Sequence, residues 1–209
     1  MRVYELASSR IKQYLKAEID FVSGYVKEGN FALELGCGYG RVLRELAIKT
    51  GLYIGIDSSL ETLSMARQYL SGHENISLIG MNAANLGFKS ATFDLTICVQ
   101  NGISAFHILP EILISESLRV TKPGGHVLIS SYSPNIWEDR LEWFRLQSEA
   151  GLLGEIDWEK TGDAKIVCRD GFSGTAFYEA EFHRLLKPLN YKYKVLTIDN
   201  SSVFCDITV

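Results

Sequence analysis

The sequence predicts a doubly wound α/β fold with three layers, in which helices cover both faces of a seven-stranded, mostly parallel sheet that ends in an antiparallel C-terminal hairpin. Three observations support this fold. Short apolar runs alternate with stretches of helical period between residues 31 and 131. A glycine-rich turn joins the first apolar run to a helical stretch. Residues 191–209 contain two further apolar runs around Asn200-Ser201.

The first elements follow from hydrophobic periodicity and capping signals. A helix is expected before the sheet, over residues 8–27, because apolar residues from Ile11 to Val26 recur at spacings of three and four. A capping box of Ser58 and Glu61 predicts that a helix begins directly after a strand that ends at Asp57. The elements expected up to residue 80 are a strand over 31–35, a helix over 41–49, a strand over 52–56, a helix over 60–70 and a strand over 76–79.

The second half of the chain continues the alternation and then departs from it. A strand over 93–99, a helix over 110–120, a turn at 122–125 and a strand over 126–131 are expected. Residues 134–177 are an expected insertion on the substrate side, with a helix near 135–150 and an antiparallel ribbon around Asp170-Gly171. A helix over 178–189 and the closing hairpin complete a single predicted domain of residues 1–209.

Composition and charge exclude several classes of function. The net charge of −4 and the absence of any basic run provide no surface for nucleic acid or an acidic membrane face. The four cysteines are far apart and form no CxxC pair, so no metal site is expected. The chain lacks an apolar stretch of membrane-spanning length. We therefore expect a reduced, soluble, cytoplasmic protein, a monomer or homodimer, that acts on a small molecule.

The turn from Glu34 to Arg41 indicates what this small molecule contains. Its three alternate glycines let the backbone approach a ligand and leave helix amides free for an anionic group, although a purely structural turn uses the same pattern. The third glycine, Gly40, comes one residue too early for a dinucleotide fingerprint, which disfavours a pyrophosphate. Asp57 is placed to accept hydrogen bonds from a ribose diol, or to cap the next helix. Glu34 favours a cation.

Five segments in order resemble motifs of the class I S-adenosylmethionine-dependent methyltransferases, and the resemblance covers most of the chain. These segments are Glu34 to Gly40, Asp57 at the end of the second strand, Asn82-Ala83-Ala84-Asn85-Leu86, Phe93-Asp94, and Arg119 to Gly125. The resemblance implies the Rossmann-like fold of that family, S-adenosylmethionine as cofactor and S-adenosylhomocysteine as product. It also implies a set of cofactor-binding residues: Glu34, Gly36, Cys37, Gly38, Gly40, Asp57, Ser58, Asn82, Ala83 and Gln100.

Some of these positions have an alternative interpretation. Family members usually have an aspartate where this chain has Asn82, and an amide oxygen accepts a hydrogen bond from adenine without the assistance of charge. Cys37 is more typical of a small apolar filler than of a nucleophile.

Methyl transfer from a sulfonium is an in-line displacement that depends mainly on alignment, so no triad or metal is required. The catalytic residues are left unassigned, with Asn101 and His107 as candidates and His107 as the candidate for a general base. Tyr14, Asn101, His107 and Arg169 are candidates for contact with the substrate. The acceptor atom is left open among nitrogen, oxygen and carbon.

Two other function classes are weighed against this enzyme. One is a catalytically inert methyltransferase-like module that binds the cofactor or another protein, which the unusual Asn82 makes conceivable. The other is a nicotinamide-dependent oxidoreductase, which Glu34 and Arg41 disfavour. A nucleic-acid methyltransferase is disfavoured by the net charge and by the segment Val99-Gln100-Asn101-Gly102, which lacks the Asn/Asp-Pro-Pro-Tyr pattern.

Overall fold

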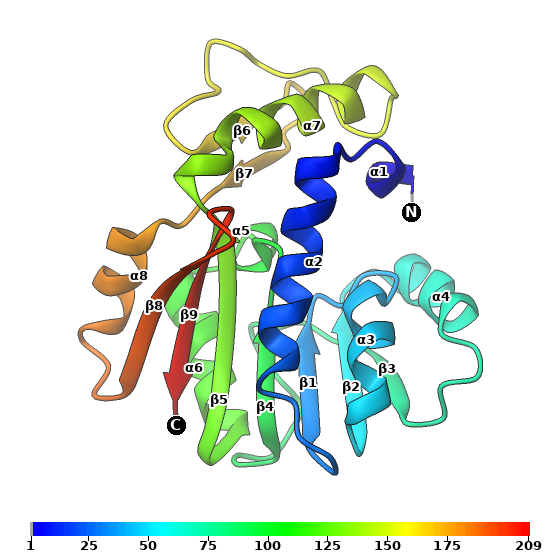
Figure 1. The fold of residues 1–209 in the computed structure, drawn as a ribbon, viewed down its shortest axis with the longest axis vertical. Coiled ribbons are helices and arrows are strands. Elements are labelled where there is room, and N and C mark those ends of the chain that lie inside the picture. Colours follow the sequence, from blue (N-terminus) through cyan, green and yellow to red (C-terminus); the bar gives the residue numbers. More distant parts are fainter. Residues whose placement is uncertain (1) are drawn as a thin grey trace.

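Seven strands form one sheet in the computed structural model, which describes residues 2–209 (Figure 1). Their order is β3-β2-β1-β4-β5-β9-β8. Strands β1 to β5 are parallel, and β9 is antiparallel to both β5 and β8, which confirms the predicted mixed sheet and closing hairpin. The strands are β1 (Phe31–Leu35), β2 (Leu52–Asp57), β3 (Ile76–Gly80), β4 (Phe93–Cys98), β5 (Thr121–Tyr132), β8 (Lys192–Ile198) and β9 (Ser202–Thr208).

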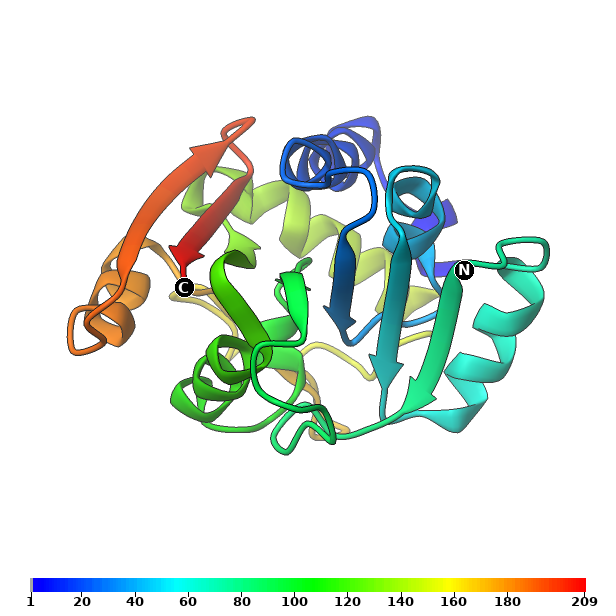
Figure 2. The same ribbon diagram turned by 90° about the horizontal axis from the view of Figure 1, so that it is seen from below.

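Helices cover both faces of this sheet and bury an apolar cluster on each. One cluster joins the sheet to α2 (Ser9–Ser23), α3 (Arg41–Leu46) and α4 (Leu60–Tyr69). The other joins it to α6 (Pro110–Val120) and α8 (Glu179–Leu186). Figure 2 shows α2 and α3 on one side of the sheet and α6 and α8 on the other. The central strands are therefore buried on both faces, as their continuous apolar sequences predict.

The expected insertion lies across the end of the sheet at which the parallel strands finish (Figure 1). It consists of η2 (Pro134–Ile136), α7 (Trp137–Glu149) and a separate ribbon of β6 (Lys165–Val167) and β7 (Ser173–Thr175). A third apolar cluster joins α7 and the segment after β7 to α2, with Trp143 and Tyr132 among its buried side chains. The insertion is thereby fixed to the core next to the carboxyl ends of β4 and β5.

Several boundaries differ from the predictions for local physical reasons. Helix α4 begins after Ser59, not Ser58, because the Ser59 side chain accepts the hydrogen bond from the Thr62 amide. Strand β5 begins five residues early, because Thr121 already pairs with Phe93 ahead of an irregularity in the register. Helix α8 ends at Leu186, before the predicted residue 189.

Four short elements complete the chain: α1 (Arg2–Glu5), α5 (Gly102–Ala105), and the 3-10 turns η1 (Ala47–Lys49) and η2. Helix α1 has no counterpart in the predictions, because four residues are too few to show a helical period. Within residues 2–209, no helix combines the length and the apolar character needed to cross a lipid bilayer.

Candidate active site

The glycine-rich turn lies between β1 and α3, at the carboxyl end of the sheet. Gly36, Gly38 and Gly40 have φ angles of +69°, +54° and +94°, a region that favours glycine. At Gly40 an added Cβ would also lie 2.5 Å from Cδ1 of Leu70. An added Cβ at Gly38 would meet no atom within 4 Å. The turn therefore has an open tip that a ligand can approach.

Asp57, at the end of β2, fixes this tip. Its Oδ2 accepts a hydrogen bond of 3.0 Å from the Gly38 amide, and its Oδ1 accepts one of 2.9 Å from the Ser59 amide. One carboxylate thus connects the glycine turn to the start of α4. Because each carboxylate oxygen can accept two hydrogen bonds, the half-buried Asp57 can still accept hydrogen bonds from a ligand.

Glu34 is a buried acid beneath the same turn, with 3% of its surface exposed. Its Oε2 accepts a hydrogen bond of 3.3 Å from the Tyr53 hydroxyl. Burial raises the pKa of Glu34 to about 8, against the opposing influence of the Arg41 charge. A buried carboxyl in this state gains most from a ligand that brings a positive charge.

Glu34 and the glycine turn border a cavity of about 180 Å³, which the end of β4 and α1 also enclose. Glu34, Gly36, Cys37 and Gly38 line it, whereas Asp57 lies outside the lining. Cys37 is buried, and burial raises the pKa of its thiol, so the side chain acts as an apolar wall. Binding sites for small molecules usually measure about 300–1,000 Å³. In this conformation the cavity therefore holds only part of a nucleoside ligand.

Tyr4 of α1 closes the cavity together with Arg41 and Gln100. The Tyr4 hydroxyl and Nη2 of Arg41 each donate a hydrogen bond of 3.1 Å to Oε1 of Gln100. The Arg41 guanidinium lies 5.5 Å from the centre of the Tyr4 ring. The indole Nε1 of Trp143 donates a hydrogen bond of 2.8 Å to the Val3 carbonyl, which ties α1 to the insertion.

Gln100 and Asn101 follow β4 in a left-handed backbone conformation, with φ of +55° and +58°. The backbone amide of Gln100 donates hydrogen bonds to Oε2 of Glu18 and to Oγ of Ser130, at 3.1 and 2.9 Å. The Asn101 side chain donates to the Thr175 carbonyl and accepts from the Ser131 hydroxyl, at 3.2 and 2.7 Å. Asn101 therefore fastens the insertion to the sheet.

A second cavity, of about 210 Å³, adjoins the first, since Gln100 and Ala105 border both. Aromatic side chains from β5, α7 and the ribbon form much of its wall: Tyr132, Trp143, Phe144 and Phe172. Arg140 of α7 also lines it, with 1% of its surface exposed. The two cavities therefore meet at Gln100 and Ala105.

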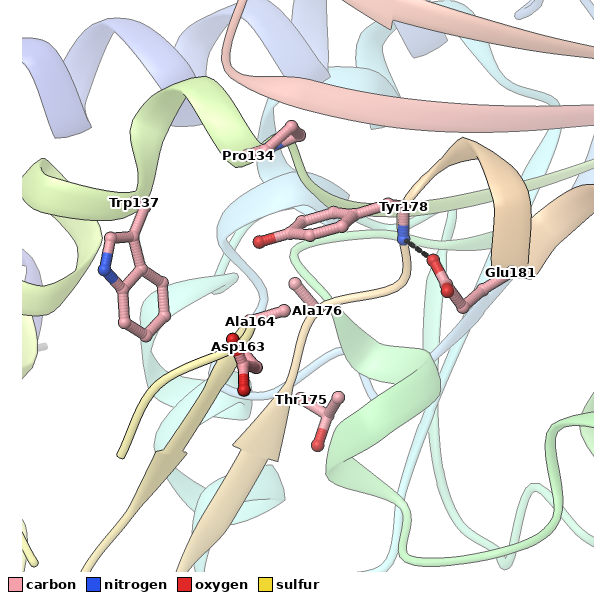
Figure 3. A pocket seen from close by; sticks show the side chains of 8 residues that line it. All are labelled: Pro134, Trp137, Asp163, Ala164, Thr175, Ala176, Tyr178 and Glu181. Atoms are coloured by element: carbon pink, nitrogen blue, oxygen red, sulfur yellow. Dashed lines mark hydrogen bonds between the residues drawn. The ribbon is translucent and has the colours of Figure 1, made fainter. Parts of the chain in front are cut away.

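A third cavity, of about 570 Å³, is larger than both of these and has no lining residue in the glycine turn. It lies between the insertion and the start of α8, where Figure 3 shows Trp137 on one side and Tyr178 with Glu181 on the other. The backbone amide of Tyr178 donates a hydrogen bond of 3.0 Å to Oε2 of Glu181, and this contact caps the start of α8. Because this third cavity is separate from the glycine turn, the two smaller cavities are the better candidate for the active site.

A model of a methyltransferase domain matches residues 32–125, which include β1 to β4, the glycine turn and the start of β5. The chain is also similar over its whole length to the crystal structure of an S-adenosylmethionine-dependent methyltransferase from Aquifex aeolicus. That match has a TM-score of 0.68 and 15% identity, and covers 100% of this chain and 97% of the other. Residues 32–125 belong to the methyltransferase domain family, and the whole chain has the fold of the solved S-adenosylmethionine-dependent methyltransferases. The predicted Rossmann-like fold and S-adenosylmethionine as cofactor are thereby confirmed.

Two curated relatives are named after the molecules that they methylate. A demethylmenaquinone methyltransferase from Bacillus licheniformis is 37% identical over 108 residues, which are 49% of this chain and 45% of that protein. A fatty-acid O-methyltransferase from Mycolicibacterium smegmatis is 28% identical over 129 residues, which are 60% of this chain and 44% of that protein. The chain thus spans less than half the length of either relative.

The remaining predicted cofactor residues lie outside the first cavity. Ser58 and Asn82 are exposed, and Oδ1 of Asn82 accepts a hydrogen bond of 2.8 Å from the Ala84 amide. Ala83 is buried in the apolar cluster under α6. Asn82 and Ala83 follow directly after β3, which is the strand beside Asp57.

The predicted substrate residues are dispersed. Tyr14 is fully buried, with its ring centre 5.1 Å from that of Tyr132. His107 is exposed and borders neither of the two adjoining cavities. Arg169 has 64% of its side chain exposed and lies 3.5 Å from a carboxylate oxygen of Glu155, as a surface pair. Of the four candidates, only Asn101 lines the second cavity.

Two buried charged residues were absent from the predictions, although a helical pattern could have indicated them. Glu18 lies at helical spacing between Leu15 and Val22, which are both buried in α2. Arg140 lies at helical spacing between Ile136 and Trp143, which are also buried. A charged residue on the inward stripe of a helix requires a polar environment, and in both helices this environment adjoins the cavities.

Proposed function

We propose that this protein transfers the methyl group of S-adenosylmethionine to a small-molecule acceptor in the second cavity. The observation that carries the proposal is the shared border of the two cavities at Gln100 and Ala105. A methyl group transferred by in-line displacement must reach a nucleophile held a few ångströms away. The shared border supports an arrangement in which the two reactants meet at Gln100 and Ala105.

The residues of the first cavity match the functional groups of the cofactor. In the proposed complex, Glu34 attracts the ammonium group of the methionine part, and the open backbone at Gly38 receives its carboxylate. Asp57 binds the ribose hydroxyls, while Asn82 and Ala83 lie beside the adenine. The buried, uncompensated carboxyl of Glu34 and the open space above Gly38 support this fit.

The protein contributes mainly orientation and the exclusion of water. When bound, S-adenosylmethionine supplies a methyl group on a positively charged sulfur. Tyr4, Arg41 and Gln100 close the first cavity, and the aromatic wall of the second keeps water from the nucleophile. Fixed alignment of two reactants contributes roughly 7–11 kcal/mol to the lowering of a barrier. In the described part of the chain, no Asp, Glu, His or Lys lines the second cavity.

A small acceptor agrees with the size and charge of the site. The second cavity measures about 210 Å³, and its wall is largely apolar. The relatives named for demethylmenaquinone and fatty acids suggest a small molecule with an apolar part. The net charge of −4 disfavours a nucleic-acid acceptor.

Titration calorimetry with S-adenosylmethionine and S-adenosylhomocysteine tests the cofactor part of the proposal. We expect micromolar binding that Asp57→Ala weakens by about 10- to 100-fold, because it removes charged hydrogen bonds to the ribose. Asp20→Ala is the matched control, since Asp20 pairs only with the exposed Lys16. Tight binding of NADH in place of either compound would contradict the proposal.

Turnover distinguishes the enzyme from an inert module that binds the cofactor. The protein is incubated with radiolabelled S-adenosylmethionine and a panel of phenols, amines, quinols and carboxylic acids, and transfer of label is measured. We expect transfer to at least one small molecule, and its loss in Asp57→Ala. Tight cofactor binding without transfer to any class of acceptor would instead support the inert module.

A further inference from the structure

Arg140 is the most deeply buried charged group beside the second cavity. It comes from α7 and has 1% of its surface exposed. Its Nη1 donates a hydrogen bond of 2.8 Å to the Ala164 carbonyl, and its Nη2 donates one of 2.7 Å to the Gly174 carbonyl. The guanidinium lies 4.4 Å from the ring centre of Tyr132 and 5.5 Å from that of Phe144. The centre of the Trp137 ring lies 5.7 Å away. Two backbone carbonyls and three aromatic rings therefore hold the guanidinium in one position.

This guanidinium has no negatively charged partner within residues 2–209. No Asp or Glu oxygen in that range lies within 4.0 Å of its nitrogens. Its Nε is buried and has no hydrogen-bond partner there either. Arg145 of the same helix is exposed, yet it pairs with both Glu142 and Glu149. A buried cation without an anion is unfavourable by several kcal/mol, which indicates that a ligand supplies the missing charge.

The second cavity has the composition of a site for an apolar anion. Arg140 is the only fully charged side chain among its described lining residues. Most of the remaining wall is aromatic or aliphatic, and Gln100 and Asn101 add polar groups at the border with the first cavity. A guanidinium presents parallel N–H groups that match the two oxygens of a carboxylate.

We propose, building on the proposed function, that Arg140 binds the carboxylate of the methyl acceptor, whose aromatic or aliphatic body occupies the rest of the second cavity. Nε and the free N–H groups of the Nη atoms donate to the carboxylate oxygens. One guanidinium balances one negative charge, so the site selects monocarboxylates over phosphate dianions. Arg140 is thereby a residue that determines specificity for the acceptor.

The competing explanation is that Arg140 only fastens α7 to the ribbon. Ala164, whose carbonyl it binds, has a φ of +71°, an unusual conformation for alanine that the hydrogen bond helps to maintain. A fastening role predicts no preference between a carboxylate and a neutral ligand of the same shape. The experiment therefore compares such pairs on the wild-type protein first, where folding is not in question.

The first measurement is calorimetric titration of the protein saturated with S-adenosylhomocysteine. The probes are phenylacetate with phenylacetamide, and octanoate with octanamide. We expect at least one acid to bind about 30-fold or more tightly than its amide, the ratio that corresponds to a buried charge pair. Equal affinity of both acids and their amides, or binding of neither acid, would overturn the inference. If S-adenosylhomocysteine itself does not bind, the proposed function fails as well, and this distinguishes the two failures.

Variants assign the effect to Arg140. Arg140→Met removes the charge and keeps much of the apolar part of the side chain. Arg140→Lys keeps the charge but lacks the parallel N–H groups of the guanidinium. Arg145→Met, on the exposed face of the same helix, is the matched control. We expect Arg140→Met to abolish the preference for the acid, Arg140→Lys to retain part of it, and Arg145→Met to leave it unchanged. A preference that persists in a folded Arg140→Met variant, with an intact thermal transition, would assign the carboxylate to another group.

Discussion

The carboxylate of Glu18 accepts a hydrogen bond of 3.1 Å from the backbone amide of Gln100, although the two residues are 82 positions apart. The same carboxylate accepts hydrogen bonds from the hydroxyls of Ser130 and Ser202, at 2.5 and 2.8 Å. Glu18 is fully buried, and burial raises its pKa. Helix α2 thus positions Gln100, which borders both cavities.

Glu18→Gln tests this relationship. The amide of glutamine places an N–H group where the carboxylate accepts hydrogen bonds, so one buried donor must face another. We expect the free energy of unfolding to fall by about 1–3 kcal/mol, measured by urea denaturation. Asp20→Asn on the same helix, whose partner Lys16 is exposed, is expected to change it by less than about 0.5 kcal/mol. Equal effects of the two substitutions would contradict the role of Glu18.

Glu34 predicts that cofactor binding releases a proton. Its pKa of about 8 leaves the carboxyl largely protonated at pH 7 in the free protein, and a bound ammonium lowers that pKa. Binding enthalpies of S-adenosylmethionine in buffers of different ionisation enthalpy are therefore expected to show the release of about one proton. The release is expected to disappear in Glu34→Gln and to persist in Glu74→Gln, an exposed control. Unchanged release in Glu34→Gln would contradict the assignment.

The same carboxyl predicts how stability depends on pH. The pKa of Glu34 is about 8 in the folded protein and 4.5 as the usual value, so folding favours the protonated form. The stability that it contributes is fully present below about pH 4.5 and is lost as the pH rises through 8. Glu34→Gln remains neutral, so we expect its free energy of unfolding to lie within about 1 kcal/mol of the wild-type value at pH 5 and to exceed it at pH 9 by about 3–5 kcal/mol. Urea denaturation at both pH values measures this difference. The same difference between variant and wild type at pH 5 and pH 9 would contradict the prediction.

The sequence was sufficient for the sheet and the glycine turn because both depend on local signals. Buried parallel strands are continuous apolar runs, and the left-handed turn from Gly36 to Gly40 requires glycines at fixed spacing. The carboxyl ends of parallel strands meet at one edge, so Asp57 and Gln100 could be placed near the turn without coordinates.

The acceptor side could not be predicted in the same way, because its contacts join distant segments. Arg140 acquires its role from the carbonyls of Ala164 and Gly174, which lie 24 and 34 positions further along the chain. His107 has a residue type suited to a general base, but its loop turns the side chain into solvent. The four residues of α1 are too few for a periodic signal, and their packing against Trp143 depends on the fold of the insertion.

Tyr4 leads to the last prediction, which concerns the release of the cofactor product. Its ring borders the first cavity, and its hydroxyl is hydrogen-bonded to Gln100. Because Tyr4, Arg41 and Gln100 close the cavity that receives the methionine part of the cofactor in the proposed complex, we expect α1 to move outward when the ligand enters or leaves. Removing the ring in Tyr4→Ala weakens this cover, and we expect dissociation of S-adenosylhomocysteine to become about 10-fold faster in stopped-flow measurements. Tyr191→Ala, an exposed tyrosine near the start of β8, is expected to leave the rate unchanged. A dissociation rate in Tyr4→Ala equal to that of the wild type would show that α1 does not limit access to the cavity.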